Sequence, residues 1–140
     1  MRIDKNGFAA EFFRTAVLFL YGGFIYGAIE ILYRGHTHPS MFVLGGICLV
    51  WIGGMDAFTG KKYPLTARML FGGIFITVSE FIFGAIFNLW LGLRVWDYSK
   101  LPLNILGQVC PLFFIAWVFL SFPAIMVADA VRKGFAEEPV

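Results

Sequence analysis

Four long apolar stretches follow one another along the chain, and most charged residues fall between them. The stretches cover residues 13–33, 41–58, 69–92 and 106–128. A helix needs about 20 apolar residues to cross a bilayer, with a range of about 17–25. The pattern therefore predicts an all-α membrane protein with four transmembrane helices joined by short loops, forming a single membrane domain over residues 1–140.

The composition agrees with this pattern. Hydrophobic residues make up 59% of the 140 residues and charged residues 14%, whereas soluble domains are about 45–50% apolar and about 25% charged. The first stretch is too long for the core of a signal peptide and is expected to be a retained helix. The net charge of +2 comes without a basic stripe, so we expect no nucleic-acid partner.

Two pairs of segments resemble each other. Tyr21–Glu30 (YGGFIYGAIE) aligns with Phe71–Glu80 (FGGIFITVSE), and the glycine pairs and the glutamates coincide at an offset of 50. Leu44–Cys48 aligns with Leu106–Cys110 at an offset of 62. The chain is therefore predicted to be two repeated helical hairpins, residues 13–58 and 63–128, related as parallel repeats about an axis along the membrane normal.

The distribution of Lys and Arg predicts the orientation. With four spans, both termini and the middle loop share one side, and that side holds eight basic residues against three on the other side. The positive-inside rule then predicts an N-in/C-in topology, with loops 34–40 and 93–105 facing outward. The eight residues are Arg2, Lys5, Arg14, Lys61, Lys62, Arg68, Arg132 and Lys133.

Glu80 lies near the middle of the third stretch, 12 residues after Arg68. This separation corresponds to roughly 18 Å of helix, about halfway through a hydrocarbon core about 30 Å thick. An ionised carboxylate there is costly unless it is paired, wetted or protonated, and such residues usually mark functional sites. Because Glu80 has no basic partner on its own helix, it must meet Arg34 or a polar group of another helix, or stay protonated.

Both glutamates lie on helix faces that carry glycines and a second polar residue. In the third stretch the face carries Asn88 further along, and in the first stretch Arg34 follows Glu30 by one turn. Acid before base at this spacing is the favoured order, so Glu30 and Arg34 can also neutralise each other at the membrane interface. The glycines allow helices to pack closely. The two faces are Gly73, Thr77, Glu80, Gly84, Asn88 and Gly23, Gly27, Glu30, Arg34.

The predicted outer loops are rich in polar groups. Two histidines in the first loop cannot fill a tetrahedral metal site, so we predict no metal and no cofactor. His38 is instead expected to hydrogen-bond a carboxylate across the mouth of the bundle. In the second loop Trp96 and Tyr98 suit the membrane interface. That loop has few charges and is expected to fold back over the bundle or to dip into the membrane interface as a lid, with Gln108 beginning the fourth helix.

Eight polar residues are predicted to converge on one cavity open to the outside. They are the candidates for binding a substrate or ion, and no catalytic residue is assigned among them. The set is Glu30, Arg34, His38, Glu80, Asn88, Asp97, Asn104 and Gln108.

Three segments carry a resemblance to a known family: Arg34–Met41 (RGHTHPSM), Glu80–Asn88 (EFIFGAIFN) and Val95–Pro111 (VWDYSKLPLNILGQVCP). With them the chain resembles the bacterial membrane proteins described as "putative ABC-transporter type IV". The resemblance implies a multi-pass protein of the bacterial cytoplasmic (inner) membrane. No G-x-x-x-x-G-K-[ST] segment is present, so an ATPase partner would be a separate chain.

Three functions remain open at this point. The favoured one is a small-solute or ion permease with an outward-facing polar cavity, which we expect to be a homo-oligomer because four helices leave little room for a pathway. An intramembrane enzyme acting on a lipid or lipid-linked substrate is an alternative, since carboxylates and a histidine can transfer protons, but no nucleophile motif is visible and enzyme activity is less favoured. The third is an accessory or binding membrane subunit.

Overall fold

The computed structural model describes residues 5–59 and 62–136. Helix α1 spans Lys5–Arg34, α2 spans Pro39–Thr59, α3 spans Leu65–Gly84 and α4 spans Pro111–Ala136. A π-helical turn, η1, continues α3 over Ala85–Trp90. Within the described ranges the fold is all-helical, as predicted, apart from one isolated bridge between Ile105 and Val109.

Three segments of the described chain are long and apolar enough to cross a membrane. They are Gly7–Arg34, Leu65–Trp90 and Pro111–Gly134, whereas the apolar part of α2, Pro39–Met55, is shorter. Of the four predicted spans, the second is therefore the one that length alone supports least. The basic residues Arg2 and Lys61, which entered the prediction of orientation, lie outside the described residues.

The fourth helix begins five residues later than predicted, at Pro111 rather than at residue 106. Leu106 and Gly107 have φ values of 53° and 73°, which a right-handed helix does not allow. Proline suits the first position of a helix because its missing N–H would have no partner there. The expectation that Gln108 begins this helix is therefore wrong, and Gln108 belongs to the preceding loop.

The helices pack as two close pairs, α1 with α2 and α3 with α4. A Cβ added at Gly22 would collide with the Gly45 carbonyl oxygen and lie 2.7 Å from Cβ of Leu49. A Cβ added at Gly73 would lie 3.0 Å from the backbone nitrogen of Val118. Glycine thus lets the backbones approach in both pairs, as is usual between helices in lipid.

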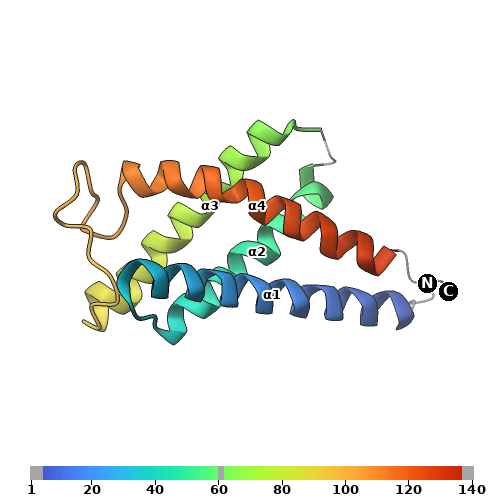
Figure 1. Cartoon of the computed structure of the whole chain (residues 1–140), viewed down its shortest axis with the longest axis horizontal. Coiled ribbons are helices and arrows are strands. Elements are labelled where there is room, and N and C mark those ends of the chain that lie inside the picture. Colours follow the sequence, from blue (N-terminus) through green and yellow to red (C-terminus); the bar gives the residue numbers. More distant parts are fainter. Residues whose placement is uncertain (1–4, 60–61, 137–140) are drawn as a thin grey trace.

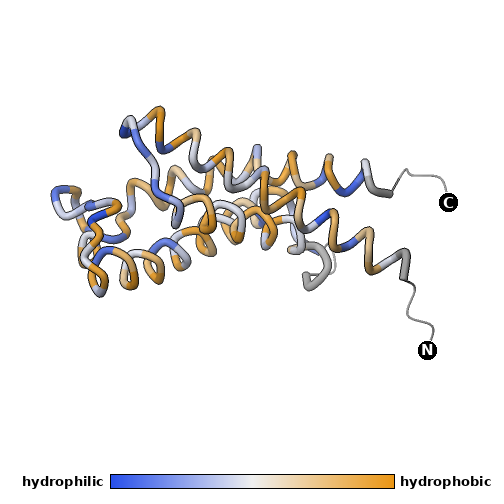
Figure 2. The backbone as a smooth tube through the Cα atoms, turned by 90° about the horizontal axis from the view of Figure 1, so that it is seen from below, coloured by the Kyte–Doolittle hydropathy of each residue, from blue (hydrophilic) through white to orange (hydrophobic). Residues whose placement is uncertain are grey.

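Helix α2 lies at the centre of the bundle and also contacts α3 and α4. Leu44, Ile52 and Met55 on this helix have at most 1% of their surface exposed. The described ends of α1 and α4 lie at the same end of the molecule as the last turn of α2 and the first turn of α3, and the loop 91–110 lies at the opposite end (Figure 1). Most of the helical backbone is coloured hydrophobic, and the loop-bearing end mixes in hydrophilic residues (Figure 2).

The two sequence matches have different structural counterparts. The matched segments Tyr21–Glu30 and Phe71–Glu80 are both helical and carry the glycines that bring the paired helices together. Leu44–Cys48 lies within α2, whereas residues 106–110 form turns in the loop. The match at offset 62 therefore pairs helix with loop, and the repeat of two hairpins stays a prediction that rests on the first match.

Candidate functional site

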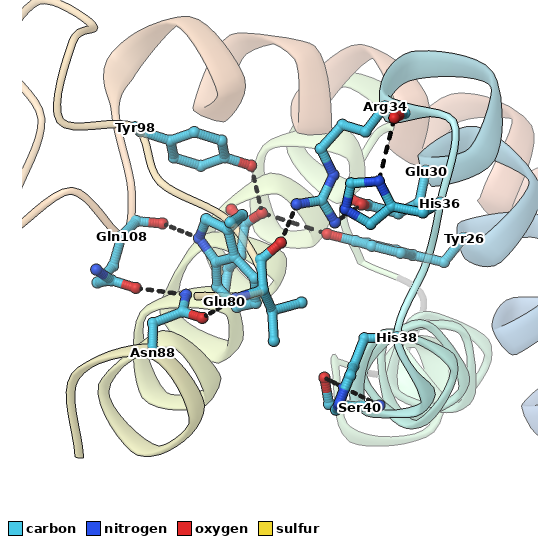
Figure 3. Close-up of polar contacts among 12 residues, drawn as sticks. Tyr26, Glu30, Arg34, His36, His38, Ser40, Glu80, Asn88, Tyr98 and Gln108 are labelled. Carbon is cyan, nitrogen blue, oxygen red and sulfur yellow. Dashed lines mark hydrogen bonds and ion pairs between the residues drawn. The ribbon is translucent and has the colours of Figure 1, made fainter. Parts of the chain in front are cut away.

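Glu80 is almost completely buried, with 1% of its surface exposed, and three side chains from three other parts of the chain donate hydrogen bonds to it. The Tyr26 hydroxyl of α1 lies 3.2 Å from Oε1, and the Tyr98 hydroxyl of the loop lies 3.0 Å from the same atom. Trp117 Nε1 of α4 lies 3.0 Å from Oε2. We name Glu80, Tyr26, Tyr98 and Trp117 the Glu80 cluster. Both tyrosines point at this glutamate in Figure 3.

The three partners of Glu80 act as hydrogen-bond donors to its carboxylate. The indole N–H of Trp117 can only donate, so Oε2 of Glu80 must accept from it. All three donors are neutral, and hydrogen bonds to a carboxylate are stronger than those between neutral groups. The rings of Tyr26 and Trp117 stack with centroids 5.4 Å apart, which holds both donors in place. Glu80 thus meets polar groups of other elements, one of the outcomes that the sequence left open.

Glu30 and Arg34 form an ion pair within the last turn of α1, and Arg34 uses its other terminal nitrogen to bond the Val95 carbonyl. The two side chains are only 10% and 18% exposed. Nε of Arg34 is buried and has no hydrogen-bond partner among the described residues. Arg34 therefore joins α1 to the loop while neutralising Glu30.

Asn88 and Gln108 anchor the loop 91–110 to the end of α3. Asn88 Nδ2 donates to Gln108 Oε1 at 2.8 Å, and Asn88 Oδ1 accepts the Val95 N–H at 2.7 Å. Trp96 Nε1 donates to the Gln108 carbonyl at 2.9 Å. Asn88 belongs to η1, whose π-helical turn changes the direction of its side chain relative to a continuous α-helix. Such turns are frequent at functional sites.

Asp97 and Asn104 lie within the loop and bond to loop backbone rather than to the Glu80 cluster. Asp97 Oδ1 accepts the Ser99 N–H at 2.8 Å, and Asn104 bonds the Leu101 carbonyl and the Gly107 N–H at 2.9 Å each. The hydrogen bond from the Ser99 backbone lowers the pKa of the Asp97 carboxyl, which is fully exposed. These two candidates shape the loop and do not enter the interior.

Trp96 and Tyr98 were expected at the membrane interface, and the structure corrects this placement. They are 4% and 8% exposed, because the loop folds back over the bundle and inserts both rings. The prediction that the loop folds back is confirmed by these buried residues and by the bond from Tyr98 to Glu80. Burial next to a carboxylate also raises the pKa of the Tyr98 phenol.

His38 does not contact a carboxylate in the described structure, contrary to expectation. It precedes α2, and its Nδ1 accepts the Ser40 N–H at 3.2 Å and lies 2.7 Å from Ser40 Oγ. A side chain that accepts a backbone N–H in this position caps the helix. His38 and Ser40 lie apart from Glu80 in Figure 3. His36 is exposed, and its Nδ1 lies 3.2 Å from the carbonyl oxygen of Arg34.

A cavity of about 100 Å³ lies among α1, α4 and the loop, and we name it the ion-pair cavity. Glu30 and Arg34 line one part of it, and Trp96 and Tyr98 of the loop line another. A second cavity of about 120 Å³, with an almost wholly apolar lining, shares Ile29, Trp117 and Leu120 with the first. The remaining residues of the ion-pair cavity are Ile29, Tyr33, Phe113, Ala116, Trp117 and Leu120.

Sequence reasoning missed Tyr26, Tyr98 and Trp117 as partners of Glu80. Aromatic residues in apolar stretches are ordinarily read as lipid-facing or packing residues, and aromatic residues are common in this chain, with 26 in all. One signal was present: Tyr26 precedes Glu30 by four residues and so shares its helix face. Nothing comparable in the sequence marks Trp117, because only the fold brings α4 beside α3.

Long apolar helices around a buried, fully bonded carboxylate are the features of a helical membrane protein. The chain belongs to the family described as "Putative ABC-transporter type IV", whose model matches residues 8–138. No curated protein and no solved structure matches the chain. The apolar helices and the family together point to a membrane protein associated with ABC transporters.

Proposed function

We propose that the protein is the membrane component of a transport system, permease-like, with the ion-pair cavity as its site for a small solute or ion. One observation carries this proposal. The buried pair of Glu30 and Arg34 borders an open volume of about 100 Å³ and does not pack against a filled core. Charged side chains inside a membrane protein commonly line substrate or ion pathways.

The proposed topology is multi-pass in the bacterial cytoplasmic membrane, N-in/C-in, with the loop 91–110 facing outward. The excess of Lys and Arg near the termini and the middle loop supports it. The described ends of α1 and α4 share one end of the molecule with the last turn of α2 and the first turn of α3, as this topology requires (Figure 1). The solute would then reach the ion-pair cavity from outside, past the loop.

We propose that transport also needs further chains: a separate ATPase that supplies energy and further copies of this protein. The sequence has no phosphate-binding G-x-x-x-x-G-K-[ST] segment, and the family name refers to ABC transporters, so a separate ATPase is the proposed partner. The four described helices leave little room for a pathway within one chain, so we propose a homo-oligomer that completes it.

A second function, an accessory subunit without its own solute site, is favoured by the Glu80 cluster. All three hydrogen bonds to Glu80 come from the chain itself, and they join α1, α3, α4 and the loop. A network of this kind stabilises one arrangement of the bundle whether or not a solute binds.

Reconstituted vesicles separate the two functions. We would follow the osmotic swelling of proteoliposomes with a panel of small cations, zwitterions, anions and neutral solutes, for the wild type and for Glu30→Gln. A permease should admit at least one solute faster than protein-free vesicles, and Glu30→Gln should reduce that flux. Glu11→Gln is the matched control, because Glu11 pairs with Arg14 on the same helix but is 61% exposed.

If no solute enters faster than into protein-free vesicles, the permease proposal is wrong for the chain alone. If Glu30→Gln lowers thermal stability and leaves every flux unchanged, the accessory role is the better account.

A further inference from the structure

The ion-pair cavity is lined by an unusual number of aromatic side chains. Five of its ten lining residues are aromatic, and they come from α1, the loop and α4: Tyr33, Trp96, Tyr98, Phe113 and Trp117. Phe113 connects them, because its ring stacks on Tyr98 with centroids 4.5 Å apart and meets the edge of Tyr33 at 5.8 Å. Trp117 follows at 6.3 Å.

The charges around the cavity do not balance. There are two carboxylates, Glu30 and Glu80, and one guanidinium, Arg34. Glu30 lines the cavity. Glu80 lies behind the lining residues Tyr98 and Trp117, and both of these donate a hydrogen bond to it. Ionised, this group carries a net charge of −1, since the three donors to Glu80 are neutral. An uncompensated charge is unfavourable in the interior of a membrane protein, and either protonation of Glu80 or one monovalent cation would neutralise it.

Aromatic faces and a negative charge are the two features that bind alkylated ammonium groups. A cation within about 6 Å of the centre of a Tyr, Trp or Phe ring is attracted by the negative face of the ring, and an alkylated ammonium group needs no hydrogen-bond acceptor from the protein. The aromatic part of the lining meets this requirement, since the polar atoms of Tyr98, Trp96 and Trp117 are already bonded to other protein groups, and Nε of Arg34 is a lining donor without a described partner.

The size of the cavity limits the ligand. About 100 Å³ is well below the roughly 300–1,000 Å³ of pockets that hold drug-sized ligands. A compact head such as trimethylammonium suits this space, whereas a nucleotide or a sugar does not. The adjoining apolar cavity of about 120 Å³ would receive an alkyl substituent.

We propose that the ion-pair cavity binds a small organic monocation with an alkylated ammonium head, held by Tyr33, Trp96, Phe113 and the carboxylate of Glu30, with Glu80 behind the lining. The inference rests on the proposed function, which it deepens by naming the class of solute.

The test compares two probes of equal shape and different charge. Full-length protein in lipid nanodiscs is titrated with choline and with its neutral carbon isostere, 3,3-dimethylbutan-1-ol, by calorimetry and by tryptophan fluorescence. Choline should bind saturably and about tenfold more tightly than the isostere, and sodium acetate at the same ionic strength should not compete. Equal binding of the two probes, or displacement of choline by acetate, would overturn the proposal.

Variants of Tyr33 locate the site. Tyr33→Leu should weaken choline binding by about two- to fivefold, the range for one exposed cation–aromatic contact, and Tyr33→Phe should restore it because the ring remains. Tyr21→Leu is the control, since Tyr21 lies on the same helix, is also exposed and lines neither cavity. Phe113→Leu should reproduce the loss. Unchanged affinity in both Tyr33→Leu and Phe113→Leu would place the cation elsewhere.

The outcome is independent of the vesicle experiment. Choline binding without any flux would contradict the permease proposal and keep the cation site. Flux of anionic or neutral solutes without choline binding would support the permease proposal and contradict the proposed cation site.

Discussion

The hydroxyl oxygen of Tyr98 lies 3.0 Å from Oε1 of Glu80, and this bond connects the loop 91–110 to the middle of α3. The same carboxylate oxygen accepts the Tyr26 hydroxyl of α1. One oxygen atom of α3 therefore links the loop to α1. Substitutions at Glu80 should therefore change both the stability of the bundle and the order of the loop.

Glu80→Leu should destabilise the protein by at least about 3 kcal/mol, because it leaves three buried donors without their acceptor at a cost of about 1–3 kcal/mol each. Glu80→Gln should cost about 1 kcal/mol, since its carbonyl can accept from Trp117 and its amide can donate to the phenol oxygens. The free energy of unfolding in mixed detergent micelles, followed by circular dichroism, checks both values.

Glu11→Gln serves as the control for this pair, because the Glu11–Arg14 pair is exposed and such pairs contribute little. A Glu80→Leu protein as stable as the wild type would show that the Glu80 cluster does not hold the bundle together.

Arg34→Lys should loosen the loop even though the charge is kept. Arg34 reaches Glu30 with one terminal nitrogen and the Val95 carbonyl with the other, and a single ammonium group cannot reproduce this fork. We expect amide exchange in residues 95–98 to become about fivefold faster, which corresponds to a loss of about 1 kcal/mol. Hydrogen–deuterium exchange with mass spectrometry measures it.

The comparison variant is Arg94→Lys in the exposed part of the same loop, which should leave the exchange of residues 95–98 as it is. If Arg34→Lys behaved in the same way, the bond to Val95 would have no role in holding the loop.

The sequence predicted the helices and the positions of the buried acids, because both depend on local pattern. Four apolar stretches led to four helices, and an acid within such a stretch cannot easily face lipid. Glu30 with Arg34 followed from a spacing of one helical turn. These inferences needed no knowledge of which helices are neighbours.

The partners of Glu80 depend on the tertiary fold and could not be predicted in the same way. Trp117 is 37 residues from Glu80, and any of the aromatic residues could have filled its place. Tyr98 was assigned to the membrane interface because the pattern does not show that the loop folds inward. Gln108 was placed in a helix because its neighbours are apolar, whereas the positive φ angles of Leu106 and Gly107 keep that segment in a turn.

Asp97 should give the loop a small stabilisation that disappears in acid. Its folded pKa lies below the ordinary value of 3.8, because the carboxylate accepts the Ser99 N–H. A group whose pKa is lowered by folding stabilises the folded state above its unfolded pKa, and this contribution is lost as the pH falls through the folded value. Asp97→Asn keeps an acceptor for the Ser99 N–H but cannot titrate.

Thermal unfolding midpoints of the wild type and Asp97→Asn, measured from about pH 7 down to about pH 3, test this prediction. The advantage of the wild type should be constant near neutral pH and should shrink once the pH falls below 3.8, the ordinary value of the carboxyl. Parallel curves over the whole range would mean that the charge of Asp97 contributes nothing to the loop.

Gly22 and Gly27 lie on the same helix and should respond oppositely to alanine. A Cβ at Gly22 would collide with the Gly45 carbonyl and lie 2.7 Å from Cβ of Leu49, so Gly22→Ala must push α1 away from α2. Overpacking of this kind costs about 1–3 kcal/mol. A Cβ at Gly27 would meet no described atom within 4 Å, so Gly27→Ala should be neutral or stabilise the helix by about 0.5–1 kcal/mol. The free energy of unfolding of each variant in detergent micelles measures this difference. Equal values for both variants would mean that α1 and α2 do not cross at Gly22 and Gly45.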